Sequence, residues 1–561
     1  MTETIEAKKP TTREALKMAL KDRQVLAMLI LGLASGLPYG AVGGALNAWL
    51  STVEVKPSAI GLLSWAFLAY AFKFMWAAAF QSRRTPFNLN IGPRRFWMVV
   101  FIVLITIGLF ALSFSSPPNG LAMIGLTSVV IAVLSASFDI VLAAWRIEAA
   151  IDDTHLDILS TVEQFGYRTA SLFTGFVALL MADKIGWRLT FLSGTVLMGF
   201  TLVGVMIARP AKIKEKAESF VRQGSHLTDF QRRLGTILIL SGWAIAFYMI
   251  ASFMFGALTD PENHSARNFI RYQGPVIIGL TVVWLGLVST ALLFVNSKQS
   301  DHKNIASEAG VLFILYQSIV EPMMELIGRL RWSIILILIV VLSYRFTDLI
   351  WGGFAYPFYL GANYGALGHT LTEVGFASKF MGVLATIFGI ALGGLAMLRF
   401  GRMPVFFVGA VLAAATNLLF ADLALGSIYT DKFLSITQLD HVFEFFTLDI
   451  RMARLTTVIF FENVAVGLAS AASIAYLSSI VNKNYAAVQY ALLVSLVMLL
   501  GVLGRPTIGV IIEEEGFAKA FILCALFGGV ASIFALIEWI RLARQAKEQE
   551  PISKSVTFDA S

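Results

Sequence analysis

Long apolar segments alternate with short polar segments along most of this chain. Three of these segments, 24–53, 234–259 and 272–297, contain no Asp, Glu, Lys or Arg. A helix needs about 20 apolar residues to cross the roughly 30 Å hydrocarbon layer of a bilayer. The pattern therefore predicts an all-α polytopic membrane protein.

The apolar segments can be counted as membrane spans. We predict fourteen spans, at residues 26–50, 57–80, 96–115, 121–145, 161–183, 187–208, 234–259, 273–296, 333–360, 372–397, 403–425, 454–480, 485–511 and 518–540. They form two blocks of six with two extra spans between them. We expect a cytoplasmic tail, a six-helix bundle, a linker segment, a second six-helix bundle and a cytoplasmic tail, at 1–23, 24–208, 209–331, 332–543 and 544–561.

The linker segment contains two predicted spans and an amphipathic segment in addition to loops. The spans 234–259 and 273–296 carry no charge, so we expect them to pack at the periphery of the bundles. Residues 307–331 are amphipathic and contain the pair Glu321–Pro322, which we expect to interrupt the helix. An amphipathic segment of this kind is typical of a helix that lies in the membrane interface, here on the cytoplasmic face.

The basic residues indicate the orientation of the spans. Of the 43 Lys and Arg residues, 29 fall in segments that are cytoplasmic if the N-terminus is cytoplasmic, and nine fall on the opposite side. This asymmetry follows the positive-inside rule and places both termini in the cytoplasm. It also accounts for the net charge of +7, so we expect no nucleic-acid partner. The composition agrees, because 57% of the residues are hydrophobic and only 14% are charged.

Charged residues inside the predicted spans are the most informative feature for function. The basic ones are Lys73, Arg168, Arg345, Lys379 and Arg505, and the acidic ones are Asp139, Asp348 and Glu462. A charge in the middle of a bilayer is costly, so such residues usually face the protein interior or a water-filled path. This set predicts a transport route for a polar, charged solute.

A carboxyl group in a partly dry site can exchange a proton when its hydration and its neighbouring charges change. We therefore predict that Asp139, then Glu462 and Asp348, couple transport to protons. Structural roles remain open alternatives. Arg345 and Asp348 are three residues apart on one helix and could simply neutralise each other, and Asp139 could form a permanent pair with Lys73 or Arg168.

The glycines of the first span form a regular series. Gly32, Gly36, Gly40 and Gly44 recur at every fourth residue and so lie along one face of the helix. Close helix packing explains such a series better than a ligand does.

Signals for an enzyme or a metal site are weak. Cys524 is the only cysteine, which excludes an intrachain disulfide and a cysteine metal cluster. The histidines all lie outside the predicted spans, and no zinc-protease, P-loop or nucleotide-binding motif is present. A membrane-embedded glycosyltransferase or sensor is a remote alternative, since the acidic outer loop 426–453 has no catalytic spacing. We expect no cofactor and no metal.

Several motifs resemble the AmpG family of muropeptide permeases within the major facilitator superfamily. They are Gly36-Leu-Pro38, Ala69-Tyr-Ala-Phe-Lys-Phe-Met-Trp76, Ser135-Ala-Ser-Phe-Asp139, Gly166-Tyr-Arg168, Glu373-Val-Gly375, Leu384-Ala-Thr386, Phe460-Phe-Glu-Asn463, Asn482-Lys483 and Gln489-Tyr-Ala-Leu-Leu493. The resemblance implies the major facilitator fold, here with 12 core helices and two inserted between the halves. It departs from the family at Ala143, where members often carry an acidic residue, and at Gln81-Ser-Arg-Arg84.

The resemblance also implies a function. AmpG-like permeases use protons to import GlcNAc-anhydro-MurNAc and its peptides across the bacterial inner membrane for cell-wall recycling, which in some bacteria feeds β-lactamase induction. We expect such an importer, acting as a monomer in the bilayer. A siderophore or acetyl-CoA transporter of the same family is the alternative. The residues expected to bind the substrate are Lys73, Tyr167, Arg168, Arg345, Lys379, Asn463 and Gln489.

Overall fold

The described part of the chain consists of helices joined by turns and loops. The computed structural model describes residues 22–73, 76, 80, 91–151, 153–209, 227–260, 263–298, 311–446, 448–482 and 486–556. These ranges contain no β-strand, so the predicted all-α fold is confirmed for them. The predictions for the tail 1–21, the loop 81–90, the linker 210–226 and residues 299–310 lie outside the described residues.

The predicted spans recur as long apolar helices. Thirteen helices in the described ranges are long and apolar enough to cross a membrane. One of them, Leu492–Gln545, covers two predicted spans, because α27 (Ala486–Val556) continues through a kink at Gly516. The predicted second span appears as the shorter apolar helix Pro57–Phe72. With Leu492–Gln545 counted as two spans and Pro57–Phe72 as one, all fourteen predicted spans have a matching helix. One further candidate, Val311–Leu330, lies where we predicted an interfacial helix.

The backbone forms two compact units, and the first consists of Met1–Ala45, Ala79–Ser115 and Thr127–Phe220. Its helices are α2 (Arg23–Gly40), α7 (Pro93–Ser113), most of α8 (Pro117–Ala149), α9 (Asp153–Leu172), α10 (Ala178–Ile185), α11 (Trp187–Phe200) and α12 (Leu202–Ile207). Two π-helical segments, η1 (Ala41–Ala45) and η5 (Phe173–Val177), continue α2 and α9. The tightest packing in this unit joins α2 to α9.

The glycine series of the first span explains that packing. A Cβ atom on Gly32 would lie 2.5 Å from the carbonyl oxygen of Glu163, and one on Gly36 would lie 2.7 Å from that of Tyr167. Gly40 meets Thr174 of η5 even more closely. Any side chain at these positions would push α9 away, so the predicted role of the series in close helix packing is confirmed for these three glycines.

The second unit consists of Leu46–Ala78, Ser116–Leu126 and Val221–Ser561. Its helices before residue 331 are α3 (Leu46–Thr52), α4 (Pro57–Leu63), η2 (Ser64–Phe67), α5 (Leu68–Phe72), α13 (Asp229–Thr259), α14 (Ala266–Ile278), η6 (Gly279–Val283), α15 (Trp284–Lys298), α16 (Val311–Leu315), η7 (Tyr316–Val320) and α17 (Glu321–Leu330). Those after it are α18 (Ser333–Tyr344), α19 (Phe346–Trp351), η8 (Gly352–Phe354), α20 (Ala355–Leu360), α21 (Leu371–Val374), η9 (Gly375–Met381), α22 (Gly382–Phe400), α23 (Arg402–Ala424), α24 (Ile428–Thr437), α25 (Leu439–Phe445), α26 (Ile450–Ile480) and α27.

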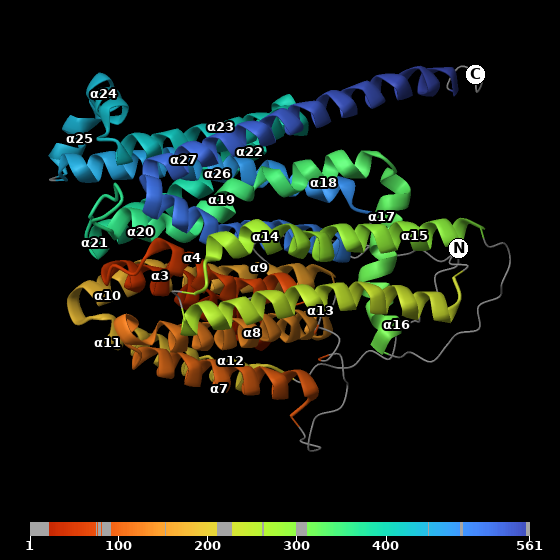
Figure 1. The fold of residues 1–561 in the computed structure, drawn as a ribbon, viewed down its shortest axis with the longest axis horizontal. Helices are drawn as coiled ribbons and strands as arrows, with labels where there is room; N and C mark the ends of the chain where they lie inside the picture. The colour runs from red at the N-terminus through yellow and green to blue at the C-terminus, as the bar shows by residue number, and fades with distance from the viewer. Residues whose placement is uncertain are drawn as a thin grey trace. The chain divides into compact units, whose positions relative to one another are not determined.

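Four long helices form the centre of this unit. In Figure 1, α22, α23, α26 and α27 run side by side, and α26 packs against both α22 and α23. The short helices α24 and α25 cover one end of α23 and α26. The same end carries α20 and α21. This end is the outer side if the orientation predicted from the basic residues is correct.

Helices α4 and α27 approach each other unusually closely. A Cβ atom on Gly509 would lie 2.6 Å from the Cα of Ser58, and one on Gly61 would lie 3.0 Å from the carbonyl oxygen of Arg505. The N-terminus of α4 is closed by Glu513, whose carboxylate accepts a hydrogen bond from the Ser58 amide at 2.7 Å. These contacts join the predicted second span to the thirteenth.

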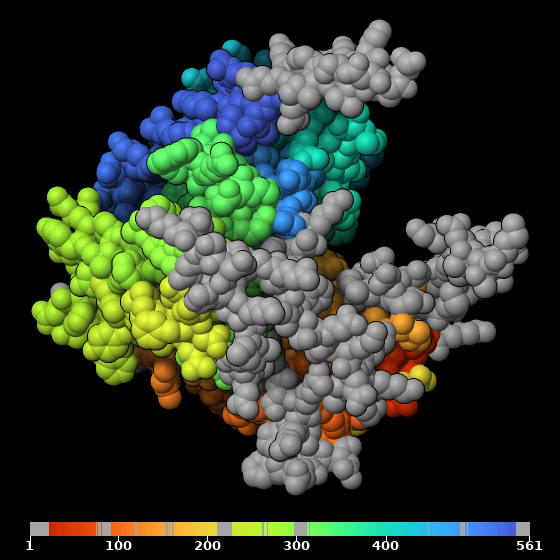
Figure 2. Space-filling view, turned by 90° about the vertical axis from the view of Figure 1, so that its right-hand side faces the viewer, coloured from red at the N-terminus to blue at the C-terminus, as the bar shows by residue number. Residues whose placement is uncertain are grey.

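The two additional spans fold as one group with the linker helices. The indole N–H groups of Trp243 and Trp284 each donate to a backbone oxygen on the other helix of the hairpin, to Thr281 at 3.0 Å and to Leu238 at 2.7 Å. Figure 2 shows this group (yellow-green) gathered against α16–α18 (green). The pair Glu321–Pro322 does not interrupt the helix here, because the π-helical η7 precedes Pro322 and the chain continues directly into α17.

A matched pair of glycines on α22 tests how strongly this packing matters. We expect Gly389→Ala to destabilise the protein by about 1–3 kcal/mol, because its Cβ would overlap the backbone of Val464 on α26. Gly394→Ala on the same helix should be neutral or stabilising, since nothing lies within 4 Å of its Cβ position and alanine favours a helix by about 1 kcal/mol. Thermal unfolding of both purified variants in detergent would compare them. Equal unfolding temperatures would contradict the close approach of α22 and α26.

Candidate functional site

Polar groups of the first unit gather around Asp139 on α8. Its carboxylate accepts a hydrogen bond from the Ser35 hydroxyl of α2 at 2.6 Å. Tyr39 and Tyr167 lie with their ring centroids 6.2 Å apart, and the Tyr167 phenol is within electrostatic reach of both Asp139 and Arg168. The close contact of α2 with α9 brings these groups together. Three residues from the predicted site, Asp139, Tyr167 and Arg168, are therefore neighbours in this unit.

Arg345 lies at an interruption of the predicted seventh core span. Its φ of −109° and ψ of 6° separate α18 from α19. The guanidinium approaches the Asp348 carboxylate to 2.9 Å and also donates to the Ser470 hydroxyl of α26. The contact with Asp348 has the distance of an ion pair without the alignment of a hydrogen bond. The pairing of Arg345 with Asp348, on which the structural alternative depends, is therefore present in the structure.

Glu462 and Asn463 lie on α26 beside this pair. The Asn463 amide donates to Glu462 Oε2 at 2.6 Å and to the Ile459 carbonyl oxygen at 2.9 Å. Its side-chain oxygen accepts a hydrogen bond from the Thr386 hydroxyl of α22 at 2.9 Å. The arrangement holds the Glu462 carboxylate in one orientation. Its electrostatic neighbours include three more residues of the predicted site, Asp348, Arg345 and Lys379.

Lys379 belongs to the π-helical segment η9. Its Nζ atom lies 5.3 Å from the ring centroid of Tyr356 on α20, which is a cation–π distance. The Tyr356 hydroxyl is buried and has no hydrogen-bond partner among the described residues. A buried hydroxyl without a partner is costly. Tyr356 therefore places an unused hydrogen-bonding group close to the cation of Lys379.

Gln489 is placed away from this cluster. Its amide donates to Glu325 of α17 at 2.6 Å and to the Pro322 carbonyl oxygen at 2.8 Å, and its oxygen accepts from the Asn482 amide. Asn482 follows α26 about 20 residues after Glu462, which corresponds to roughly 30 Å along a helix. The contacts of Gln489 thus attach the linker helix α17 and Asn482, which follows α26, to the start of α27.

The other intramembrane cations occupy separate places. Lys73 follows α5 at its C-terminal end and is partly exposed. Arg505 donates from Nε to the Leu349 carbonyl oxygen of α19 at 2.9 Å and packs against Gly353. Arg505 thus ties α27 to the interrupted span that carries Arg345.

Sequence reasoning missed several residues that the structure brings to these clusters. They are Ser35, Ser470, Glu325 and His369, whose side chains contact Asp139, Arg345, Gln489 and Glu373, respectively. Serine is common in membrane helices, so Ser35 and Ser470 gave no signal. His369 lies outside the predicted spans, where a single histidine indicates no particular function. In the described part of the chain, no group of three or more His, Cys, Asp or Glu side chains could hold a metal ion.

Comparison with curated proteins supports the resemblance found in the motifs. The chain is 26% identical over 511 residues to the anhydromuropeptide permease of Escherichia coli K12, which covers 91% of this chain and 78% of that protein. It is 22% identical over 477 residues to a protein of Rickettsia felis named putative transporter AmpG 4, with 85% and 86% coverage. No family model matches the chain.

Solved structures show the fold. A POT family peptide transporter described as auto-inhibited matches with a TM-score of 0.58 and 12% identity, covering 93% of this chain and 97% of that one. The xylose transporter XylE of E. coli matches with a TM-score of 0.50 and 13% identity, covering 93% and 95%. The predicted resemblance and the major facilitator fold are confirmed. The chain is a multi-pass membrane transporter of small molecules rather than an enzyme.

Proposed function

We propose that this transporter is a proton-coupled importer of anhydro-muropeptides, that is, of GlcNAc-anhydro-MurNAc and its peptides. It would carry them across the bacterial inner membrane for cell-wall recycling. The observation that carries the proposal is the similarity to the E. coli anhydromuropeptide permease over 91% of the chain. The protein acts as a monomer with both termini in the cytoplasm, and its activity feeds β-lactamase induction where that response exists. The relatives named above do not favour the siderophore or acetyl-CoA alternative.

The chemistry of the two clusters suits this substrate. An anhydro-muropeptide carries two sugars, a flexible peptide and carboxylates on that peptide. Lys379 and Arg345 supply cations in the second unit, and the Tyr356 hydroxyl is available for a hydrogen bond. A small neutral sugar would not need buried cations. Asn463 lies beside these groups and positions Glu462.

The residues Arg168, Tyr167 and Lys73 complete the proposed binding set. Arg168 and Tyr167 adjoin Asp139 in the first unit, and a phenol ring suits the apolar face of a sugar. In the structure Arg168 is exposed and Lys73 is partly exposed. Charge-removing variants at Lys73 or Arg168 should weaken substrate binding, because each removes a cation that would attract the carboxylates of the peptide. Gln489 is the remaining member of the predicted set, and its part would be indirect, since its amide holds α17 through Glu325.

Proton coupling is assigned to Asp139 first, then to Glu462 and Asp348. A carboxyl group binds a proton more tightly when it is desolvated and less tightly beside a cation. Alternating access changes both conditions at each cycle. Asp139 has a hydroxyl partner in Ser35, whereas Glu462 and Asp348 share the nearby Arg345.

An uptake experiment tests the substrate. The chain is expressed in an E. coli strain that lacks its own anhydromuropeptide permease, and uptake of radiolabelled GlcNAc-anhydro-MurNAc is measured with and without a protonophore. We expect uptake that the protonophore abolishes. Membrane-inserted protein that restores growth on a ferric siderophore but imports no glycopeptide would overturn the proposal in favour of the alternative.

A further inference from the structure

The segment 361–370 connects α20 to α21 and folds back onto the end of α20. The amides of Leu367 and His369 donate to the carbonyl oxygens of Phe358 and Tyr359, both at 2.8 Å. Gly368 closes the segment on itself by donating to the Gly361 oxygen at 2.9 Å. The segment is therefore an ordered strap over the end of a predicted span rather than a simple connection. We call residues 361–370 the outer strap.

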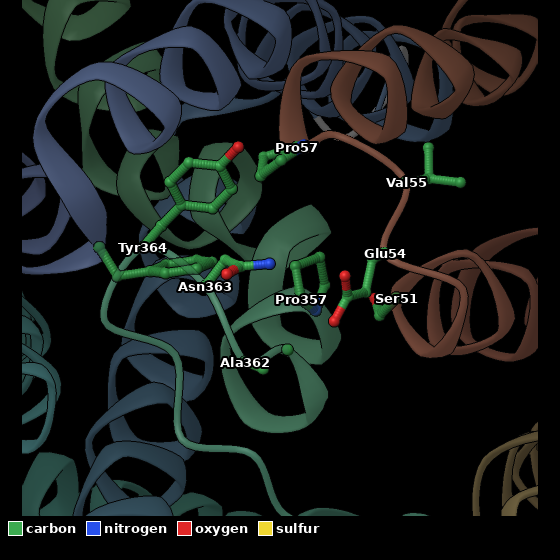
Figure 3. A pocket seen from close by; sticks show the side chains of 10 residues that line it. Ser51, Glu54, Val55, Pro57, Pro357, Ala362, Asn363 and Tyr364 are labelled. Atoms are coloured by element: carbon green, nitrogen blue, oxygen red, sulfur yellow. The ribbon is translucent and has the colours of Figure 1, made fainter.

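One side of the outer strap meets the turn between α3 and α4. Together they line a small pocket of about 40 Å³, whose walls include Ser51, Glu54, Pro357, Asn363, Tyr364 and Phe517. Figure 3 shows Asn363 and Glu54 on opposite sides of the pocket with Pro357 between them. The Tyr364 carbonyl oxygen also accepts a hydrogen bond from the Phe517 amide of α27 at 2.9 Å. The strap thus touches the ends of three predicted spans.

The other side of the outer strap is fixed by His369. Its side chain is buried, with 6% of the residue exposed, and Nδ1 lies 3.0 Å from Glu373 Oε2 of α21. The same oxygen accepts the Thr370 amide at 2.9 Å in the capping box of α21. From α26, Arg451 donates to the carbonyl oxygens of Leu367 and Gly368 at 2.8 and 3.0 Å. The charged groups that act on His369 are therefore Glu373, Arg451 and Asp449.

The state of His369 should depend on external acidity. Burial lowers the pKa of His369 below its ordinary value, and the opposing effect of the Glu373 carboxylate is smaller. Because the pKa is lowered in the folded strap, the neutral imidazole stabilises the strap, and this stabilisation is complete above about pH 6.5. It is lost as the pH falls through the lowered value. His369 lies between the candidate spans Ser333–Leu360 and Leu371–Phe400, on the side we predict to be outer.

We propose that His369 is a proton-operated catch, whose protonation from the outer side releases the outer strap from α3, α4 and α27 and so favours opening of the outer entrance. This inference rests on the proposed proton-driven import. It adds a site of proton entry that is separate from the intramembrane carboxylates. A proton that binds His369 from the outer side would thus act directly on the outer entrance. The reason is that the outer strap lies over the ends of α3, α4 and α27, which would have to separate when the entrance opens.

A buried serine in the pocket allows the catch to be measured without substrate. Ser51 is 5% exposed and lines the pocket, so a cysteine introduced there should react with a membrane-impermeant maleimide only when the strap is released. The variant Ser51→Cys is made in a Cys524→Ala background and reconstituted in proteoliposomes. The reference is Tyr429→Cys in the same background, because Tyr429 is 76% exposed on α24. The ratio of the two labelling rates cancels the pH dependence of thiol reactivity.

We expect the ratio to rise several-fold between pH 7.5 and 5, with a midpoint below about 6.5. His369→Gln should remove this pH dependence. His441→Gln should leave it unchanged, since His441 is a surface histidine 3.7 Å from Glu444. Glu373→Gln should move the midpoint to lower pH, because it removes the carboxylate that favours the charged imidazole.

The outcomes separate this inference from the proposed function. A ratio that stays constant with pH in the presence of His369 overturns the catch, as does pH dependence that survives His369→Gln. If His369→Gln does not fold, an unchanged midpoint in Glu373→Gln overturns it instead. Because no substrate is present in the assay, a failure to transport glycopeptide would overturn the proposed function and leave the catch standing.

Discussion

Arg345→Met should be among the most damaging substitutions in this protein, with a loss of about 3–5 kcal/mol of stability. The change removes the cation that lies 2.9 Å from Asp348, whose side chain is only 12% exposed. It also removes the donor to the Ser470 hydroxyl. An uncompensated carboxylate would then remain inside the helix bundle. The yield of monodisperse protein and its thermal unfolding temperature in detergent measure the effect.

Two further variants would test whether the loss of stability is due to the buried pair of Arg345 with Asp348. Arg345→Met combined with Asp348→Asn should recover much of the lost stability, because no unpaired charge remains. Arg267→Met is the matched control, since Arg267 forms an ion pair with Glu514 at 2.6 Å in which both side chains are about half exposed. An exposed pair contributes only about 0–1 kcal/mol. If the two single Arg→Met variants unfold at the same temperature, the pair of Arg345 with Asp348 has no special structural role.

The number and type of the elements could be predicted because they depend on local composition. A run of about 20 apolar residues is sufficient to indicate a membrane helix, whatever it packs against. The break between the last two spans also follows from the sequence, because Gly516 lies between the two apolar runs and its positive φ of 83° separates the two helices that α27 joins. The course of the chain in the linker was less accessible. The segment around Pro322 was expected to be interrupted, but a π-helical turn accommodates the proline without a break.

The presence of buried charges could be predicted, and so could the pair of Arg345 with Asp348, which are three residues apart. Partners on other helices could not be predicted. Charge inside an apolar segment is visible in the sequence, and Asp139, Glu462 and Arg345 were found in this way. The pairing of Ser35 with Asp139 joins residues 104 positions apart and depends on how two helices are rotated against each other. In a membrane protein the lipid-facing side of a helix is as apolar as the packed side, so periodicity gives little information on rotation.

The position of Gln489 illustrates a related limit of motif reasoning. Its motif resembled a family pattern, and an amide in a span was a reasonable candidate for substrate binding. The structure places the amide in a group of hydrogen bonds with Glu325, Pro322 and Asn482. Glu325 belongs to the linker between the two blocks of spans. Nothing in the sequence connects these two regions, because they are 164 residues apart.

The largest functional effect is expected for Asp139→Asn, which should reduce accumulation of substrate against a gradient to simple equilibration. Asparagine retains the size of the side chain and can still bond the Ser35 hydroxyl, so folding should be preserved. It cannot bind and release a proton. Uptake of labelled glycopeptide into membrane vesicles with an imposed pH gradient measures accumulation. Exchange of internal for external substrate, which needs no net proton movement, should remain close to that of the unchanged protein.

The Glu462→Gln variant distinguishes the two candidate carboxylates. If Asp139 carries the proton alone, Glu462→Gln should retain uphill uptake, although the hydrogen bond from Asn463 becomes weaker. Glu444→Gln is the control, since that side chain is 83% exposed on α25. Full uphill uptake by Asp139→Asn would assign the coupling to Glu462 or Asp348. If the Asp139→Asn protein fails to fold, Asp139 has a structural role instead. A residue that only carries protons can be replaced by a neutral side chain of the same size without loss of folding. A member of a permanent ion pair cannot, because its partner would be left unpaired.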